Sequence, residues 1–306
     1  MIVRIRPTDS INAAALAVLT CLTLYVRHRL ADPAAILGLY AALGIGLALI
    51  ALLARRADRL STPMRLLVDF YPAAFLPLVF NTLEPLIRAL RGGPRDEILI
   101  AADQAMFGVD VTVWLQRFVR PGLSDALFMF YATYYFLALI LGFILWRHDH
   151  ATARRYIFTL MVCYYVSYAG YFLLPALGPR FAQAHEYTVS IIQSPISRTI
   201  SDTINRLEKT KFDVFPSGHT LISVAVLLVS WKRARRAFWF FLPIATGLII
   251  STVYCRYHYV ADVLAGIACA VLAVPLGDRA YDAWREREGA AARVAAVGEP
   301  PPASTY

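Results

Sequence analysis

Long apolar runs separated by short polar connections recur along most of this chain. A helix needs roughly 20 mostly apolar residues to cross the hydrocarbon core of a bilayer. The pattern predicts eight spans, at about 11–26, 34–54, 66–83, 123–146, 156–176, 217–231, 237–254 and 259–277. The third is interrupted by Asp69, Pro72 and Pro77, and the first lacks the cleavage site of a signal peptide. We therefore expect an all-α, polytopic membrane helical bundle of about eight spans, six of which could form its core.

Composition and charge support a membrane protein. Hydrophobic residues make up 58% of the chain and charged residues 17%, whereas soluble domains carry about 25% charged residues. If the N-terminus is cytoplasmic, the short connections on that side hold 17 of the 30 Lys and Arg residues, as the positive-inside rule expects. The chain lacks the basic stripe with interleaved aromatic residues that would indicate nucleic-acid binding. Its Ala-, Arg- and Leu-rich composition favours a bacterial inner (cytoplasmic) membrane.

Two connections, about 84–122 and 177–216, are too long to be simple turns. Within the first, residues 97–119 have apolar positions at helical spacing, which predicts a re-entrant or interfacial helix or, alternatively, an amphipathic surface helix. We expect one membrane domain over residues 1–285, with its motif core at about 123–277, and a disordered cytoplasmic tail over 286–306. Four cysteines lie in or beside apolar spans without metal-ligand spacing, and we expect them to pack as small hydrophobic residues: Cys21, Cys163, Cys255 and Cys269.

A polar motif stands where the sixth span begins. Its residues are Phe215, Pro216, Ser217, Gly218, His219 and Thr220. Pro suits the first turn of a helix and Ser suits its cap, while Gly lets backbone approach a ligand closely. The N–H groups of such a helix start bind anions, and His219 lies in that first turn. The alternative interpretation is a helix cap with an incidental histidine.

A second motif pairs His258 with Asp262. Residues four apart share a helix face, so the carboxylate can accept one ring N–H and leave the other nitrogen as a nucleophile. The alternative is a structural pair that ties two helices together. Ionisable residues within membrane spans are costly and usually functional, which favours chemistry.

Two arginines are candidate phosphate ligands, because a guanidinium can hold a phosphate in a bidentate fork. Arg180 follows the fifth span, where an arginine can also be a simple interfacial anchor. Arg256 lies two residues before His258, and a helix would place the two on different faces. The alternating topology brings Arg180, His219 and His258 to the same, outer side of the membrane, which predicts one site.

These motifs resemble those of the type 2 phosphatidic acid phosphatase superfamily. Residues 215–220 match its second motif, and residues 251–266 match its third in order and spacing. The third motif departs from the family pattern at Thr252, where an arginine is usual, and residues 175–180 stand in place of the usual first motif. Both departures, and the stretch 103–135, are similar to the branch that contains inositol phosphorylceramide synthases.

The resemblance implies a mechanism. His258 would attack phosphorus and form a phosphohistidine, Asp262 would orient it, and His219 would act as acid and then as base. Four residues would bind the phosphate oxygens: Arg180, Ser217, Gly218 and Arg256. No metal and no cofactor would be needed, because arginines and a helix start already offset the charge.

We therefore expect a membrane lipid phosphatase or phosphotransferase whose substrate is a phospholipid or lipid phosphate. Transfer of a phospho-headgroup to an alcohol or ceramide-like acceptor stands beside hydrolysis by a polyprenyl-diphosphate or phosphatidic acid phosphatase. A different class is a non-catalytic transporter or scaffold that keeps the fold, for which the missing arginine at Thr252 is the argument. The acceptor, the lipid and the oligomeric state stay open at this point.

Overall fold

A computed structural model describes residues 6–56, 59–192, 194–207 and 210–297. Within these ranges the chain is helical and has no strand. Six helical segments are long and apolar enough to cross a membrane, and two bent helix pairs bring the number to eight at most. The chain is therefore an all-α, multi-pass integral membrane protein.

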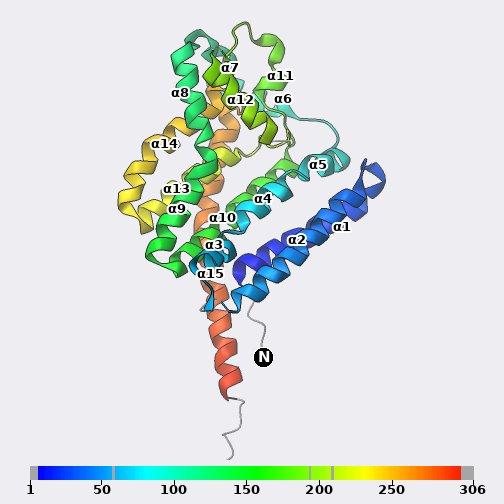
Figure 1. The fold of residues 1–306 in the computed structure, drawn as a ribbon. Helices are drawn as coiled ribbons and strands as arrows, with labels where there is room; N and C mark the ends of the chain where they lie inside the picture. Colours follow the sequence, from blue (N-terminus) through cyan, green and yellow to red (C-terminus); the bar gives the residue numbers. More distant parts are fainter. Residues whose placement is uncertain (1–5, 57–58, 193, 208–209, 298–306) are drawn as a thin grey trace, which may run out of the picture.

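Seven α-helices lie within the described residues before Pro121, and Figure 1 shows their arrangement. They are α1 (Pro7–Val26), α2 (Pro33–Ala54), α3 (Thr62–Phe70), α4 (Pro72–Phe80), α5 (Leu83–Arg91), α6 (Asp96–Phe107) and α7 (Val111–Trp114). Short 3-10 turns follow two of them, at Arg27–Arg29 and Leu115–Phe118. Proline begins α1, α2 and α4, where its missing N–H leaves no hydrogen bond unmade.

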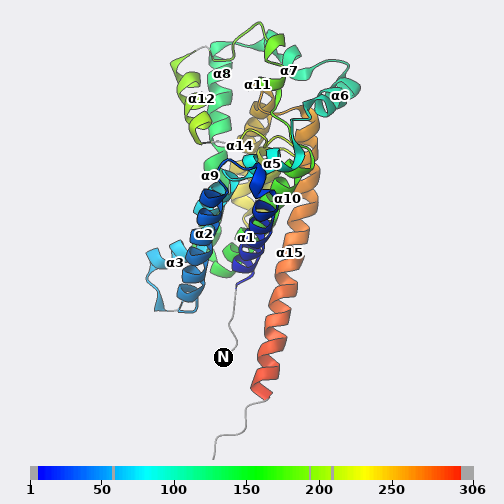
Figure 2. The same ribbon diagram turned by 90° about the vertical axis from the view of Figure 1, so that its right-hand side faces the viewer.

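From Pro121 on, the described residues form eight more α-helices. They are α8 (Pro121–Ala132), α9 (Tyr134–His148), α10 (His150–Leu173), α11 (Pro179–Ala182), α12 (Pro195–Leu207), α13 (Gly218–Arg233), α14 (Arg235–Tyr254) and α15 (Val260–Val297), with a 3-10 turn at Ala184–Glu186. The core forms where α10 packs on α15 and where α13 packs on both α14 and α15. Figure 2 shows α6, α7, α11 and α12 gathered at one end of the bundle, with the start of α1 and the far end of α15 at the other.

Three expected helices are interrupted or end elsewhere. The helix expected over 97–119 is a pair of helical segments bent by 66°, because Gly108 takes a left-handed conformation (φ 71°) and ends α6. The span expected over 123–146 is bent by 45° between α8 and α9. There the Thr133 hydroxyl donates to the Phe130 carbonyl, a local bond that bends helices. The span expected over 66–83 corresponds to the candidate span Thr62–Phe80, in which a turn at Tyr71 separates α3 from α4.

The end of α15 also differs from the expectation. The helix continues to Val297, through residues that the sequence assigned to the tail. Ala, Arg and Glu dominate this stretch and favour a helix even without packing. Residues 298–306 lie outside the described residues.

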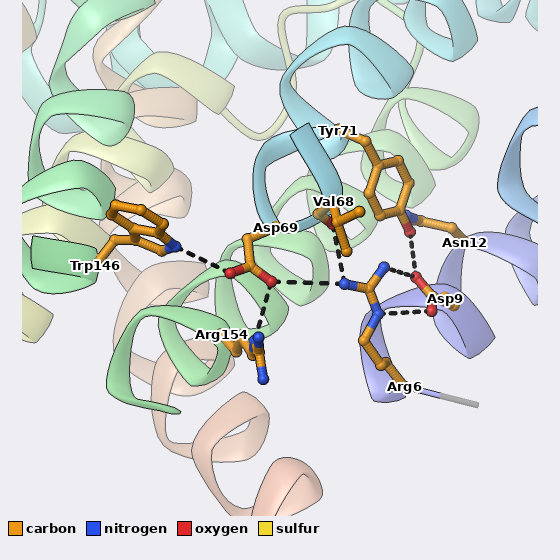
Figure 3. Close-up of polar contacts among 8 residues, drawn as sticks. All are labelled: Arg6, Asp9, Asn12, Val68, Asp69, Tyr71, Trp146 and Arg154. Carbon is orange, nitrogen blue, oxygen red and sulfur yellow. Dashed lines mark hydrogen bonds and ion pairs between the residues drawn. The ribbon is translucent and has the colours of Figure 1, made fainter. Parts of the chain in front are cut away.

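A buried ionic cluster fixes α1 and α3 against α9 and α10 (Figure 3). The Asp69 carboxylate accepts from Trp146 Nε1 at 2.9 Å and from Arg154 Nε at 2.9 Å. Arg6 lies 3.6 Å from Asp69 and pairs with Asp9 at 2.8 Å. The start of α1, the end of α3 and the neighbouring helices α9 and α10 are thus joined by hydrogen bonds and ion pairs at one end of the bundle.

Candidate active site

Two histidines from segments far apart in the sequence meet at the start of α13. His219 Nδ1 lies 3.2 Å from His258 Nε2, and both side chains are buried. His219 stands in the first turn of α13, and His258 lies in the connection between α14 and α15. The contact brings together motifs that are 39 residues apart.

His258 is oriented from its other ring nitrogen. Asp262 Oδ1 lies 3.0 Å from His258 Nδ1, and Asp262 is fully buried. The second carboxylate oxygen of Asp262 accepts from the Tyr259 backbone N–H at 2.9 Å. The carboxylate is therefore held on two sides, and it directs His258 Nε2 toward His219.

The start of α13 is capped as the sequence predicts. Ser217 is the N-cap, and its hydroxyl accepts from the Thr220 N–H at 3.2 Å. The Ser217 N–H donates to the Asp262 carbonyl at 3.1 Å, which ties the two motifs through the backbone. A Cβ added at Gly266 on α15 would lie 2.7 Å from the Ser217 carbonyl oxygen, so only glycine permits this approach of α15 to α13.

The two candidate arginines point into a neighbouring hollow. The Arg180 guanidinium donates to Asn205 Oδ1 at 3.0 Å and stacks over the Tyr257 ring at 4.2 Å. Arg256 donates to the Val189 carbonyl at 2.7 Å and lies over the Tyr187 ring at 3.7 Å.

This hollow has a volume of about 340 Å³ and is lined by both arginines. Burial lowers the pKa of the Arg256 guanidinium, which is the direction expected for a cation removed from water. An anion bound in the hollow would favour the charged form of Arg256.

A stack of rings connects the hollow to the histidines. Tyr257, under Arg180, stacks on Tyr131 with centroids 4.3 Å apart. Tyr131 in turn contacts the His219 ring at 4.7 Å, and Tyr134 contacts it at 4.2 Å. The backbone keeps the regions together, because the Arg180 N–H donates to the Arg256 carbonyl at 2.9 Å. The Tyr257 and Tyr131 rings thus lie between the Arg180 guanidinium and the His219 ring. The guanidinium itself is directed to Asn205.

Two aspartates on α6 hold the loops of the site, and the sequence analysis did not single them out. Asp103 accepts the backbone N–H groups of Val260 and Ala261 at 3.0 and 2.7 Å, which caps the start of α15. Asp96 accepts from the backbone of Leu177 and Gly178 and from the Tyr259 hydroxyl, at 2.8 to 2.9 Å.

The spacing of Asp96 and Asp103 is the sequence feature that indicates their role. Asp96, Leu99 and Asp103 are all buried and share one face of α6. Two buried carboxylates on an apolar helix face need partners, and here the partners come from the loops on both sides of the histidine site.

The carbonyl of Thr252 supports the same loop. It accepts the backbone N–H groups of Tyr257 and His258, at 2.9 and 3.1 Å. Thr252 is fully buried. Its carbonyl therefore helps to hold the backbone of His258 in position.

Comparisons with known proteins identify the family of this helical bundle. The chain belongs to the PAP2 superfamily, whose family model matches residues 97–276.

Two curated proteins are similar to parts of the chain. A PA-phosphatase related-family protein of Dictyostelium discoideum is 29% identical over 40% of this chain and 23% of its own length. A phosphoinositol dihydroceramide synthase of Bacteroides thetaiotaomicron is 26% identical over 47% of this chain and 52% of its own length. The chain thus spans at most about half the length of these relatives. No solved structure matches it.

Proposed function

We propose that this protein transfers the phosphate or phosphodiester group of a membrane lipid through a phosphohistidine on His258. The proposal rests on one observation: a buried histidine lies between a carboxylate at 3.0 Å and a second histidine at 3.2 Å. The Asp262 contact at Nδ1 leaves Nε2 as the nucleophile. His219 protonates the leaving oxygen and then takes the proton of the acceptor.

The other proposed residues hold the phosphate oxygens. The first turn of α13 begins at Gly218, and helix starts present N–H groups without intrahelical acceptors. Ser217 and Gly218 would therefore bind oxygens of the group on His258. Arg180 and Arg256 would bind the same group or the headgroup attached to it, and Arg180 would exchange its contact with Asn205 for that anion.

Transfer to an alcohol is the favoured reaction. The Bacteroides relative is named a phosphoinositol dihydroceramide synthase, which supports transfer of a phosphoinositol group to a ceramide-like acceptor. The Dictyostelium relative is named a PA-phosphatase related-family protein, which supports the second candidate, hydrolysis of phosphatidic acid or a related lipid phosphate. Both use the same phosphohistidine and differ in the acceptor that reaches His219.

Purified protein incubated with radiolabelled phospholipids and lipid phosphates, with and without inositol and ceramide, tests this function. A new labelled lipid that requires an acceptor would establish transfer, and released inorganic phosphate would establish hydrolysis. The phosphohistidine would also carry radiolabel on the protein, and this label would be acid-labile. Both products and the labelled protein are expected to disappear in His258→Ala and to persist in His185→Ala. His185 is a matched control because its side chain is 79% exposed. Unchanged turnover in His258→Ala would overturn the proposal.

We also propose that the site faces the extracytoplasmic side of a bacterial inner membrane. The argument is the excess of basic residues in the connections at the opposite end. A cysteine at exposed Ser190, beside the arginine hollow, is expected to react with a membrane-impermeant maleimide in intact cells. A cysteine at exposed Arg287 on α15 is expected to react only after the membrane is opened. The reverse pattern would contradict this orientation.

A further inference from the structure

A long apolar cavity of about 300 Å³ reaches His219 from within the helical bundle. It lies between α4, α9 and α10 and ends at the start of α13. Near His219, the Tyr171 hydroxyl lies so close to Gly218 that an added Cβ would come within 2.6 Å of it. At the distant end, Phe70 and Tyr156 lie around Gly142. The cavity therefore connects the proposed acid–base histidine with the interior of the membrane span.

The shape of the cavity is narrow for its length. Its lining residues on α10 extend from Tyr156 to Tyr171, which is about 22 Å at 1.5 Å per residue. Its volume lies at the lower end of the ~300–1,000 Å³ typical of ligand pockets. A slot of these proportions fits one extended hydrocarbon chain better than a compact polar headgroup.

The walls have the matching chemistry. Aliphatic and aromatic side chains line most of the cavity, and its polar groups are chiefly tyrosine hydroxyls, together with Asn81 at the end of α4 and with Asp213 and His219 near the start of α13. The arginines line the separate hollow beyond the Tyr131–Tyr257 stack. An apolar chain and a charged headgroup thus have different places around the histidine pair.

The cavity also has an opening toward the lipid. Three of its lining residues are exposed: Ala73 and Pro77 on α4, and Leu139 on α9. Both helices belong to candidate spans, so these exposed side chains face hydrocarbon. Helix α4 lies outside the residues 97–276 that match the family model, so this wall is supplied by the chain's own N-terminal part.

We propose that this cavity binds one hydrocarbon chain of the lipid whose oxygen exchanges a proton with His219. The inference rests on the proposed function and names its substrate class, a long-chain lipid alcohol. In the first half-reaction the P–O bond to the lipid breaks, a P–N bond to His258 forms, and His219 gives its proton to the departing lipid oxygen. In the second, His219 takes the proton of an accepting lipid hydroxyl, whose oxygen attacks phosphorus and releases His258.

The leaving lipid and the accepting lipid therefore use the cavity in turn. Each enters and leaves through the opening between α4 and α9. One chain lies in the slot, and any further chain remains in the bilayer.

Blocking the opening tests the inference. Ala73→Trp places a large ring at the opening, whereas Ala74→Trp adds the same ring to an exposed neighbour that does not line the cavity. Leu139→Trp and Ile140→Trp form a second such pair on α9. All four side chains face lipid, so folding is expected to be kept.

The first readout is binding, and it needs no turnover. A photoreactive long-chain alcohol carrying a diazirine is expected to label peptides of α9 and α10 in the wild type, in Ala74→Trp and in His258→Ala. Labelling of these peptides is expected to fall at least about fivefold in Ala73→Trp. Equal labelling of all lipid-facing helices, unaffected by Ala73→Trp, would overturn the cavity as the chain site.

The second readout is the phosphoenzyme formed from dioleoyl and dihexanoyl phosphatidylinositol. Ala73→Trp is expected to raise KM for the dioleoyl donor about tenfold, because burial of a long chain is lost, and to leave kcat with the dihexanoyl donor within about twofold. Equal behaviour toward both donors would overturn the inference and leave the phosphohistidine intact. Localised labelling without any phosphoenzyme would instead overturn the proposed function and leave the chain site standing.

Discussion

Two sets of buried aspartates lie at opposite ends of the helical bundle, and their carboxylates bind different kinds of partner. Asp9 and Asp69 pair with the guanidinium groups of Arg6 and Arg154, as Figure 3 shows. At the other end, Asp96 and Asp103 accept backbone N–H groups of loops. The first set pairs with arginine side chains and joins helices, whereas the second set holds the backbone on both sides of the histidine pair, at Gly178 and at the start of α15.

Asp262 resembles the second set but adds a histidine. It accepts one backbone N–H, from Tyr259, and lies 3.0 Å from His258. A buried carboxylate that meets an imidazole can stabilise the positive charge that develops on the ring. Under the proposed function, the comparison predicts that the arginine-paired aspartates contribute to stability and that Asp262 contributes to the reaction rate.

The largest expected effect separates these roles directly. Asp262→Asn keeps the size of the side chain and removes its charge, so turnover is expected to fall by about 10³–10⁴-fold, as when a buried carboxylate partner of a catalytic histidine is lost. Single-turnover formation of the phosphoenzyme measures the change. A melting temperature near that of the wild type would show that the loss is chemical. Turnover within about tenfold of the wild type would contradict the role of Asp262.

A smaller loss of rate is expected from Asp103→Asn. The amide keeps one acceptor for the N–H groups of Val260 and Ala261 but loses the second, so the loop of His258 is held less firmly. We expect kcat to fall about 10- to 100-fold, the range seen when outer partners of a site are removed, with little change in KM. Asp110→Asn is the control, since Asp110 contacts only Gln104 among the side-chain bonds observed. Equal effects of both substitutions would argue against positioning by Asp103.

Gly266→Ala tests the close approach of α15 to α13. The new methyl group would lie 2.7 Å from the Ser217 carbonyl oxygen, so the start of α13 must shift, at a cost of about 1–3 kcal/mol. We expect turnover to fall about tenfold because His219 moves with that turn. Gly46→Ala, where nothing lies within 4 Å, should have no effect. An unchanged rate in Gly266→Ala would show that the spacing of the two motifs is not critical.

Asp69→Asn is expected to have the smallest effect on rate. It leaves Arg154 without its charged partner, and removing one partner of a buried pair costs about 3–5 kcal/mol. The loss here should be nearer 2 kcal/mol, because Arg154 is 38% exposed and water screens it. Unfolding in mixed micelles measures the stability, while turnover per folded molecule should stay within about twofold of the wild type. A larger loss of turnover per folded molecule would contradict the distinction between the arginine-paired aspartates and those beside the histidine pair.

The local features of the site could be predicted from sequence. Ser217 caps a helix that begins at Gly218, because that motif carries its own capping chemistry. The pairing of His258 with Asp262 also depends on a four-residue spacing. The alternation of spans then predicts that His219 and His258 lie on one side of the membrane.

Features that depend on distant contacts could not be predicted. The direction of Arg180 is set by Asn205 and the Tyr257 ring, and that of Arg256 by Val189. No local spacing reports these partners. The bend at Thr133 likewise arises from one hydroxyl that bonds to the Phe130 carbonyl, which hydrophobicity along the chain does not reveal.

The opening between α4 and α9 changes which concentration governs the reaction. A substrate that enters sideways from the bilayer is sampled by diffusion in two dimensions, so the rate follows its mole fraction among the membrane lipids. Diluting the substrate with inert lipid should then slow the enzyme, whereas adding buffer at constant membrane composition should not. The exposed side chains of Ala73, Pro77 and Leu139 at this opening would thus link turnover to the lipid composition of the surrounding membrane.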